Sequence, residues 1–140
     1  MSDMQGSVGG KLFCITTDAV IIREGKVLLI KRSTPPFTGS WALPGGKVDI
    51  AETLADAARR EAREEANIKI EVGRRIGVYD AVDRDPSKRA FTTAFLCTTK
   101  GEPRPDGEET SEAKWFPLDS LPALAFDHEK IIRDASAIQP

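Results

Sequence analysis

Runs of aliphatic and β-branched residues alternate with short polar segments along this chain, and they predict most of its strands. The first two runs are separated by Arg23-Glu24-Gly25, which is typical of a β-hairpin with a glycine turn. Later runs of the same kind follow a helical segment and a charged loop. The expected strands span 12–22, 26–30, 68–78, 90–99 and 113–116.

A segment from 52 to 66 is rich in Ala, Glu and Arg and contains no Gly or Pro, so it predicts a helix. Asp49 is a candidate N-cap, because Glu52 follows three residues later. Asn67 is a plausible end, since Asn tolerates the left-handed conformation in which many helices stop. Residues 31–43 and the Pro44-Gly45-Gly46 turn are expected to form a loop before this helix.

The last apolar pattern predicts a second helix over 128–137, which Asp127 can cap and which packs on the sheet through Ile131 and Ile132. Strands on both sides of one helix, followed by a terminal helix, indicate an α/β sandwich around a mixed sheet. The chain of 140 residues has room for one domain, 1–140, with a core of about 12–137.

The first helix has an acidic stretch on the face that should pack on the sheet. At 100° per residue, Glu61 and Glu65 fall on the arc of Leu54 and Ala58, with Glu64 at its flank. Carboxylates three and four residues apart lie about 5–6 Å apart at Cβ and repel each other. The charges favour a hard divalent cation bound by oxygen ligands.

An alternative is that this acidic stretch is a solvated helix end, paired with Arg60 and Arg63. The spacing of residues over the longer stretch from Gly46 to Ile68 favours the metal site. Gly46, five residues, Glu52, seven residues and the segment 60–68 together resemble the Nudix box, G-x5-E-x7-R-E-U-x-E-E-x-G-U, where U is aliphatic. The departures are Asn67 in place of Gly and Ala62 in place of a larger aliphatic residue, and neither removes a carboxylate.

The resemblance implies a Nudix-type α/β/α sandwich and a bound Mg²⁺, for which Mn²⁺ can substitute. The implied metal ligands are the carbonyl of Gly45 and the carboxylates of Glu61, Glu64 and Glu65. Three other motif positions are expected to have structural roles: Gly46, Glu52 and Arg60. Glu52 and Arg60 would form an ion pair that braces the loop against the helix.

A further acid is expected from the loop 101–111, since Nudix enzymes often use one there as a metal ligand or as the base. Glu109 is favoured by its spacing to Trp115, although Glu108 and Glu112 are also candidates and the loop could simply be solvated. The general base is expected to be either Glu64 or Glu109.

Two segments resemble the ADP-ribose pyrophosphatase branch of this family: Arg84-Asp85-Pro86 and Leu124-Ala125-Phe126-Asp127-His128. The resemblance implies hydrolysis of a nucleoside diphosphate linked to another group, most specifically ADP-ribose to AMP and ribose 5-phosphate. An arginine beside such a site can clamp a phosphate, and Trp41 and Phe37 either stack on the base or pack the loop. The candidate phosphate-binding arginines are Arg84, then Arg32 and Arg89.

The sequence is also compatible with two other functions. One is a pyrophosphohydrolase of nucleoside triphosphates or dinucleotides, which would clean nucleotide pools. The other is a non-catalytic ADP-ribose-binding module, against which the intact set of box glutamates counts. The resemblance also allows a homodimer.

The composition argues against a polymeric nucleic acid as the partner and favours a small-molecule substrate. The formal net charge is −2, so there is no broad basic surface of the kind that polymeric nucleic acid needs. Residues 1–10 have no apolar stretch like that of a signal peptide, and no run is long enough to cross a membrane, so a cytoplasmic protein is expected. Cys14 and Cys97 are expected to be buried and unpaired, and His128 to be structural.

Overall fold

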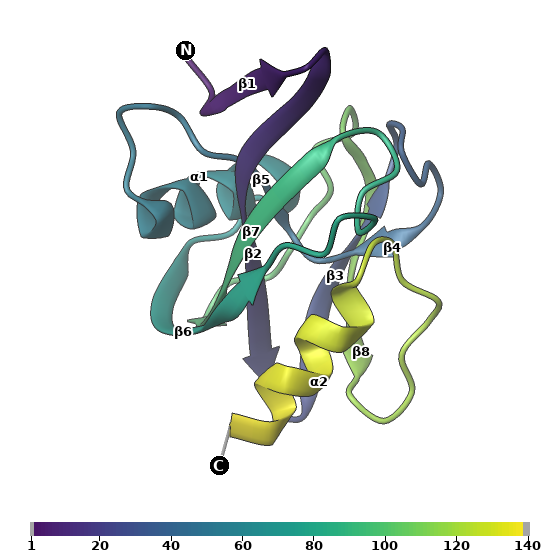
Figure 1. The fold of residues 1–140 in the computed structure, drawn as a ribbon. Coiled ribbons are helices and arrows are strands. Elements are labelled where there is room, and N and C mark those ends of the chain that lie inside the picture. Colours follow the sequence, from purple (N-terminus) through teal and green to yellow (C-terminus); the bar gives the residue numbers. More distant parts are fainter. Residues whose placement is uncertain (1, 139–140) are drawn as a thin grey trace.

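The computed structural model describes residues 2–138, which form a mixed sheet with one helix on each face (Figure 1). The strands are β1 (Gln5–Val8), β2 (Lys11–Arg23), β3 (Lys26–Arg32), β4 (Trp41–Ala42), β5 (Gly45–Lys47), β6 (Ile70–Tyr79), β7 (Arg89–Thr99) and β8 (Thr110–Pro117). The helices are α1 (Leu54–Ala66) and α2 (His128–Ile138).

The sheet is built around β2 and β7, which run parallel from Phe13 opposite Arg89 to Ile21 opposite Cys97. Its main order is β4-β3-β2-β7-β6, with β1 and β5 also pairing β2 and with β8 pairing β3. The other strand pairs are antiparallel. The expected mixed sheet is therefore confirmed, and so is the hairpin at 23–25, where β2 meets β3.

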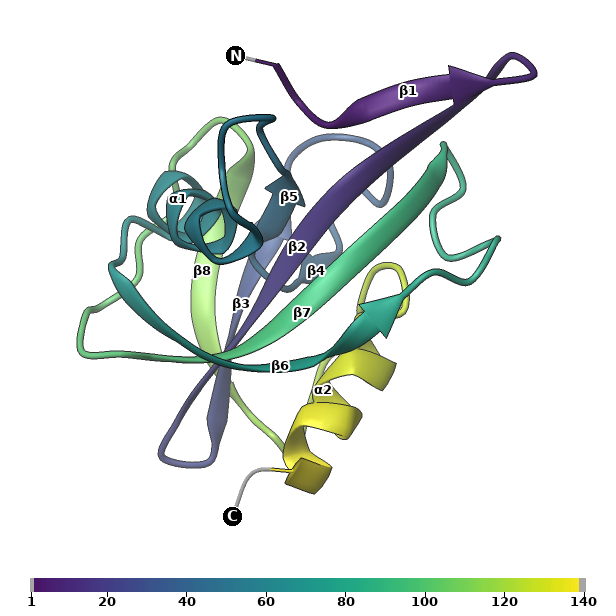
Figure 2. The same cartoon turned by 60° about the vertical axis from the view of Figure 1, so that its left-hand side comes forward.

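Each face of the sheet has its own apolar core, because successive side chains of a strand point to opposite faces. Ile21 of β2 packs in the cluster that contains Ala58 and Ala62 of α1. Its neighbour Val20 packs in the cluster that contains Ile131 of α2. Figure 2 shows the two helices on opposite sides of β2 and β7. This is the α/β/α sandwich that the sequence predicted.

Three short strands were not expected from the sequence. β1 lies in the polar N-terminal segment, β4 lies in the expected loop 31–43, and Gly45–Lys47 forms β5 where a glycine turn was predicted. These segments are too short to show apolar alternation. Their strand conformation comes from pairing with neighbours distant in sequence, as when Asp18 of β2 pairs Gly45 of β5.

The first helix begins at Leu54, two residues after the predicted start, and the predicted N-cap, Asp49, is wrong. Thr53 is the N-cap of α1, and its hydroxyl accepts a hydrogen bond from the Asp56 N–H at 3.1 Å. Asp49 lies in the preceding loop, where its own N–H donates to the carboxylate of Glu52 at 2.9 Å. The predicted end is confirmed, because Asn67 has φ 55° in the left-handed region.

We expect the Thr53→Ala substitution to lower the free energy of unfolding by about 1 kcal/mol, since it leaves an N–H of the first helical turn without its acceptor. Urea denaturation of both proteins measures the difference. Thr53→Ser keeps the hydroxyl and serves as the control. An equal loss in the serine variant would show that the threonine methyl group, rather than the cap, is responsible.

None of the helices within residues 2–138 combines the length and the apolar character that a membrane crossing requires.

Candidate active site

Three carboxylates from two elements meet beside the C-terminal half of α1. Glu61 and Glu65 come from the helix and Glu109 from the loop before β8, and one carboxylate oxygen of each lies within 4.8 Å of the others. Glu61 and Glu65 are buried, whereas Glu109 is exposed. We refer to these three residues as the acid group. It brings together two predicted metal ligands and the predicted loop acid.

Glu64 does not point toward the core, contrary to the prediction from the helical arc. Its side chain is 49% exposed and its carboxylate lies 3.0 Å from Arg60. The position that faces the sheet is Ala62, which is fully buried in the α1 core cluster. Ala58, Glu61 and Glu65 of the predicted arc are buried as expected, so the prediction is wrong at the flank, where Ala62 rather than Glu64 packs inward.

Burying the ionised carboxylates of Glu61 and Glu65 costs free energy when no cation neutralises their charge. Desolvation raises the pKa of Glu61 to about 7, although the nearby Arg60 guanidinium opposes this effect. The pKa of Glu65 is raised well above its usual range, first by burial and then by the charge of Glu61. A carboxylate with a raised pKa favours a positive charge beside it.

The donor set of the acid group fits a hard divalent cation. All three side chains offer carboxylate oxygens, which suit Mg²⁺ or Mn²⁺ rather than a metal that prefers nitrogen or sulfur. A cation among them would also offset the cost of burying the charges of Glu61 and Glu65, which raises the pKa values of both carboxyl groups.

Strand β5 brings its backbone against these acids. The Gly45 N–H donates to a carboxylate oxygen of Glu65 at 2.8 Å. A Cβ atom at Gly46 would lie 2.6 Å from the carboxyl carbon of Glu61, and one at Gly45 would overlap Asp18. Neither glycine has a positive φ among the described residues. Both are therefore needed for close approach, rather than for a turn conformation.

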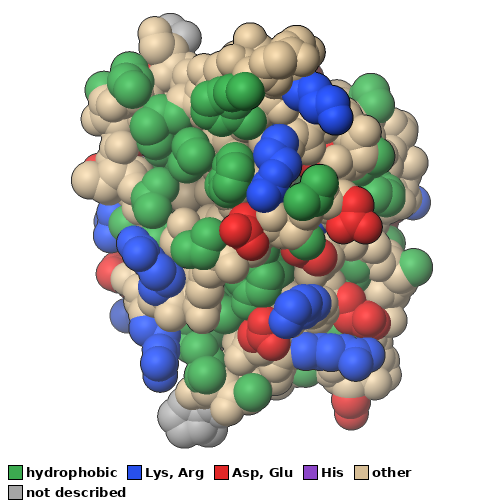
Figure 3. Space-filling model, viewed as in Figure 1, with side chains coloured by type: hydrophobic (Ala, Val, Ile, Leu, Met, Phe, Trp, Pro, Cys, Tyr) green, Lys and Arg blue, Asp and Glu red, His purple; other side chains and the backbone are tan. Residues whose placement is uncertain are grey.

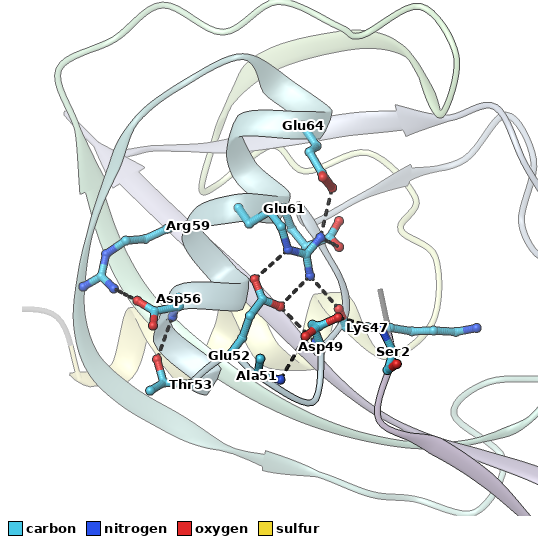
Figure 4. A network of polar contacts seen from close by, with 11 residues as sticks. Ser2, Lys47, Asp49, Ala51, Glu52, Thr53, Asp56, Arg59, Glu61 and Glu64 are labelled. Carbon is cyan, nitrogen blue, oxygen red and sulfur yellow. Dashed lines mark hydrogen bonds and ion pairs between the residues drawn. The ribbon is translucent and has the colours of Figure 1, made fainter.

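Arg60 holds the loop before α1 against the helix. Figure 4 labels its partners Lys47, Glu52, Glu61 and Glu64. The Arg60 guanidinium donates to both carboxylate oxygens of Glu52, at 2.7 and 2.8 Å, and to the backbone oxygen of Lys47 at 2.9 Å. The remaining terminal nitrogen donates to Glu61 at 2.8 Å and Glu64 at 3.0 Å. The ion pair of Glu52 and Arg60 thus fixes both the loop and one member of the acid group.

A cleft of about 180 Å³ lies on the α2 side of the sheet and reaches the same glycines. Its floor is formed by β2 and β7, where the hydroxyls of Thr16 and Thr92 hydrogen bond to each other. Its walls come from the loops 33–40 and 80–88, from β5 and from the start of α2. Gly45 and Gly46 line the cleft and also contact the acid group, so the two are adjacent.

Arg84 lies in the wall of the cleft, but its guanidinium is already engaged. It donates to both carboxylate oxygens of Asp127, at 3.0 and 2.7 Å, and the side chain is only 4% exposed. This pair joins the two segments that the sequence linked to the ADP-ribose pyrophosphatase branch. Arg84 therefore ties the 80–88 loop to the start of α2.

The other predicted substrate-binding residues lie at different distances from the cleft. Arg32 lines the cleft. Burial lowers the pKa of its guanidinium, and the negative charges of Glu65 and other acids partly oppose this effect. Phe37 packs against Phe126, a cleft residue, with ring centroids 4.8 Å apart. Trp41 packs on Phe116 in the α2 core. Arg89 lies outside the cleft and donates to the Asp80 carbonyl at 2.5 Å.

Sequence reasoning did not identify Asp18, which is only 6% exposed at the floor of the cleft. Its carboxylate oxygen lies 3.3 Å from His128 Nε2, and His128 Nδ1 accepts a hydrogen bond from the Leu43 N–H at 3.0 Å. The sequence feature that could have identified Asp18 is its position as a charged residue inside a run of aliphatic and β-branched residues. Cys14 and Cys97 are buried and unpaired, as predicted.

Charged side chains are mixed on the surface that Figure 3 shows. Acidic and basic groups alternate there, and neither sign forms a wide area on that face. This distribution agrees with the small net charge of −2.

Comparison with known proteins gives consistent matches over most of the chain. The NUDIX domain family model matches residues 13–135. An ADP-ribose pyrophosphatase of Methanocaldococcus jannaschii is 42% identical over 120 residues, which cover 86% of this chain and 71% of that protein.

Solved structures agree with this result. A MutT NUDIX hydrolase from Burkholderia pseudomallei superimposes with a TM-score of 0.80 at 34% identity, covering 87% of this chain and 97% of that one. The NUDIX domain of Shewanella oneidensis NrtR, solved in complex with ADP ribose, has a TM-score of 0.77 at 30% identity, covering 89% and 86%.

Proposed function

This chain belongs to the Nudix hydrolase family, and from that premise we propose that it hydrolyses a nucleoside diphosphate linked to another group. We infer that the substrate is ADP-ribose and that the products are AMP and ribose 5-phosphate. The observation that carries this proposal is the acid group of Glu61, Glu65 and Glu109, which adjoins a polar cleft through Gly45 and Gly46.

In this proposal the acid group and the carbonyl of Gly45 hold Mg²⁺ or Mn²⁺. The bound cation would neutralise the diphosphate oxygens and acidify a water molecule near neutral pH. The Gly45 N–H orients Glu65, and Arg60 orients Glu61, so both carboxylates are fixed before substrate arrives. The absence of a side chain at Gly46 leaves room for the Glu61 carboxylate.

The reaction adds water to one phosphorus and breaks the bond from that phosphorus to the bridging oxygen. A carboxylate must accept the proton of the attacking water. Glu109 and Glu64 are the two candidates for this base. Glu109 lies within the acid group, and Glu64 is half-exposed and restrained by Arg60, so it could act as a further ligand or as the base.

ADP-ribose is favoured as the substrate by two relatives. The M. jannaschii protein carries the name ADP-ribose pyrophosphatase, and the NrtR domain was solved with ADP ribose. The ion pair of Arg84 and Asp127 adds support, since it joins the two segments that resemble this branch.

A substrate panel tests the proposed function. The panel contains ADP-ribose, NADH, diadenosine polyphosphates, and normal and oxidised nucleoside triphosphates, assayed with Mg²⁺ or Mn²⁺ and again with chelator. We expect ADP-ribose to have the highest kcat/KM and chelator to abolish turnover. A triphosphate or a dinucleotide in first place would overturn the substrate assignment. Tight ADP-ribose binding without turnover would instead indicate a binding module.

A further inference from the structure

Asp18 is a buried carboxylate with an unsatisfied oxygen at the floor of the cleft. Its Oδ2 accepts no hydrogen bond, although it lies 3.3 Å from His128 Nε2 and 3.8 Å from Arg84 Nη2. Asp85 lines the same cleft, but one of its oxygens accepts from the N–H and the hydroxyl of Ser87, and the other pairs with Lys88. A buried carboxylate normally receives hydrogen bonds, so Asp18 requires a donor that the described residues do not provide.

The two neighbouring side chains are held by other partners. Arg84 directs its fork at Asp127, with both hydrogen bonds at or below 3.0 Å. His128 is fixed by the hydrogen bond that its Nδ1 accepts from Leu43, which leaves Nε2 near Asp18 without a hydrogen bond between them. The donor must therefore come from the cleft, either from a water molecule or from a ligand hydroxyl that takes its place.

The cleft contains basic as well as acidic side chains, which are Arg32, Lys47, Arg84, Lys88, Asp18 and Asp85. Asp85 is paired with Lys88 and Arg84 with Asp127, so Asp18 is the cleft carboxylate that still lacks a hydrogen-bond donor at one oxygen. Gly45 lies directly beside Asp18, and its N–H contacts the acid group, where a cation would meet the diphosphate. The carboxylate of Asp18 is therefore suited to a hydroxyl-bearing group that is attached to the diphosphate.

The polarity of the floor favours a sugar. The floor consists of Asp18, Ala90 and the paired hydroxyls of Thr16 and Thr92, whereas the aromatic Phe126 belongs to a wall. A carboxylate is a good acceptor for ribose hydroxyls, as in dinucleotide-binding sites.

We propose that Asp18 is a specificity-determining residue that accepts hydrogen bonds from the hydroxyls of the terminal ribose of ADP-ribose. This inference rests on the proposed function and specifies the orientation of its substrate. The ribose lies on the floor of the cleft, and the diphosphate extends over Gly45 and Gly46 toward the acid group.

The product ribose 5-phosphate tests this subsite without catalysis. Calorimetric titration of the Mg²⁺-loaded protein should give an affinity for ribose 5-phosphate about tenfold or more above that for 2-deoxyribose 5-phosphate, because one hydrogen bond to a charged group is lost. The Asp18→Asn variant should lose most of this preference. Equal affinities in the wild-type protein, or no measurable binding of ribose 5-phosphate, would overturn the proposal.

Asp85→Asn is the matched control, since it removes a second buried charge of the same cleft whose oxygens already have partners. It should preserve the preference for ribose; equal loss in both variants would mean that cleft charge, and not Asp18, is responsible. If Asp18→Asn does not fold, the wild-type comparison of the two sugars decides alone. A preference for ribose without hydrolysis of ADP-ribose would refute the proposed function and support the ribose subsite. Hydrolysis of ADP-ribose without that preference would support the proposed function and refute the ribose subsite.

Discussion

Replacing Glu65 by glutamine is expected to lower the rate of diphosphate hydrolysis by about a thousandfold, because it removes a charge that holds the metal in the transition state. Glutamine keeps the shape of the side chain and an oxygen that can accept the Gly45 N–H. The measurement is kcat/KM for ADP-ribose at saturating Mg²⁺, together with the affinity for Mn²⁺.

The same substitution should not destabilise the metal-free protein. The pKa of Glu65 is raised in the folded state, so its ionised form costs stability as pH rises above the usual range of a carboxyl group. At pH 8 with chelator, the Tm of the glutamine variant should equal or exceed that of the wild type. In Mg²⁺ the order should reverse, because binding stabilises only the wild type.

Glu64→Gln is the control for this prediction. It removes a charge from the adjacent position, where the side chain is 49% exposed and lies outside the acid group. We expect a smaller loss of metal affinity than in the Glu65 variant. Full activity with unchanged metal binding in Glu65→Gln would refute the metal assignment.

Replacing Arg60 by alanine is expected to reduce the free energy of unfolding by about 2–4 kcal/mol, since two largely buried carboxylates lose their shared partner. Glu52 and Glu61 have side chains only 17% and 10% exposed, and each receives a short hydrogen bond from Arg60. Urea denaturation with chelator present measures the change. Metal affinity should also fall, because Arg60 is the group that opposes the raised pKa of Glu61.

The pH dependence of this difference follows from Glu52. Its pKa is lowered below 4.5 in the folded state, chiefly by the hydrogen bond from Arg60. The stabilisation is therefore present above pH 4.5 and is lost as pH falls through the lowered pKa. The wild-type and Arg60→Ala proteins should become more similar in stability at acid pH.

Arg59→Ala is the matched control, because this neighbouring arginine forms an exposed ion pair with Asp56, with side chains 49% and 57% exposed. We expect it to change stability by less than about 1 kcal/mol. An equal loss in the Arg59 and Arg60 variants would indicate that helix propensity or net charge, and not the buried network, explains the effect.

The sequence by itself determined the elements that local patterns encode. The hairpin at Arg23-Glu24-Gly25, the end of α1 at Asn67 and the α/β/α class follow from turn chemistry and apolar periodicity, both of which act over a few residues. The spacing from Gly46 to Ile68 likewise placed the acids on one helix. The ion pair of Glu52 and Arg60, which the motif implied, is present.

Tertiary structure decided which of these side chains share a site. Helical periodicity gives the centre of a buried face but not its edges, and packing placed Ala62 in the core and left Glu64 exposed. Glu109 joined the acid group because the pairing of β8 with β3 brings its loop to α1. The pair of Arg84 and Asp127 and the unsatisfied oxygen of Asp18 depend on contacts between residues more than 40 positions apart, which no local pattern encodes.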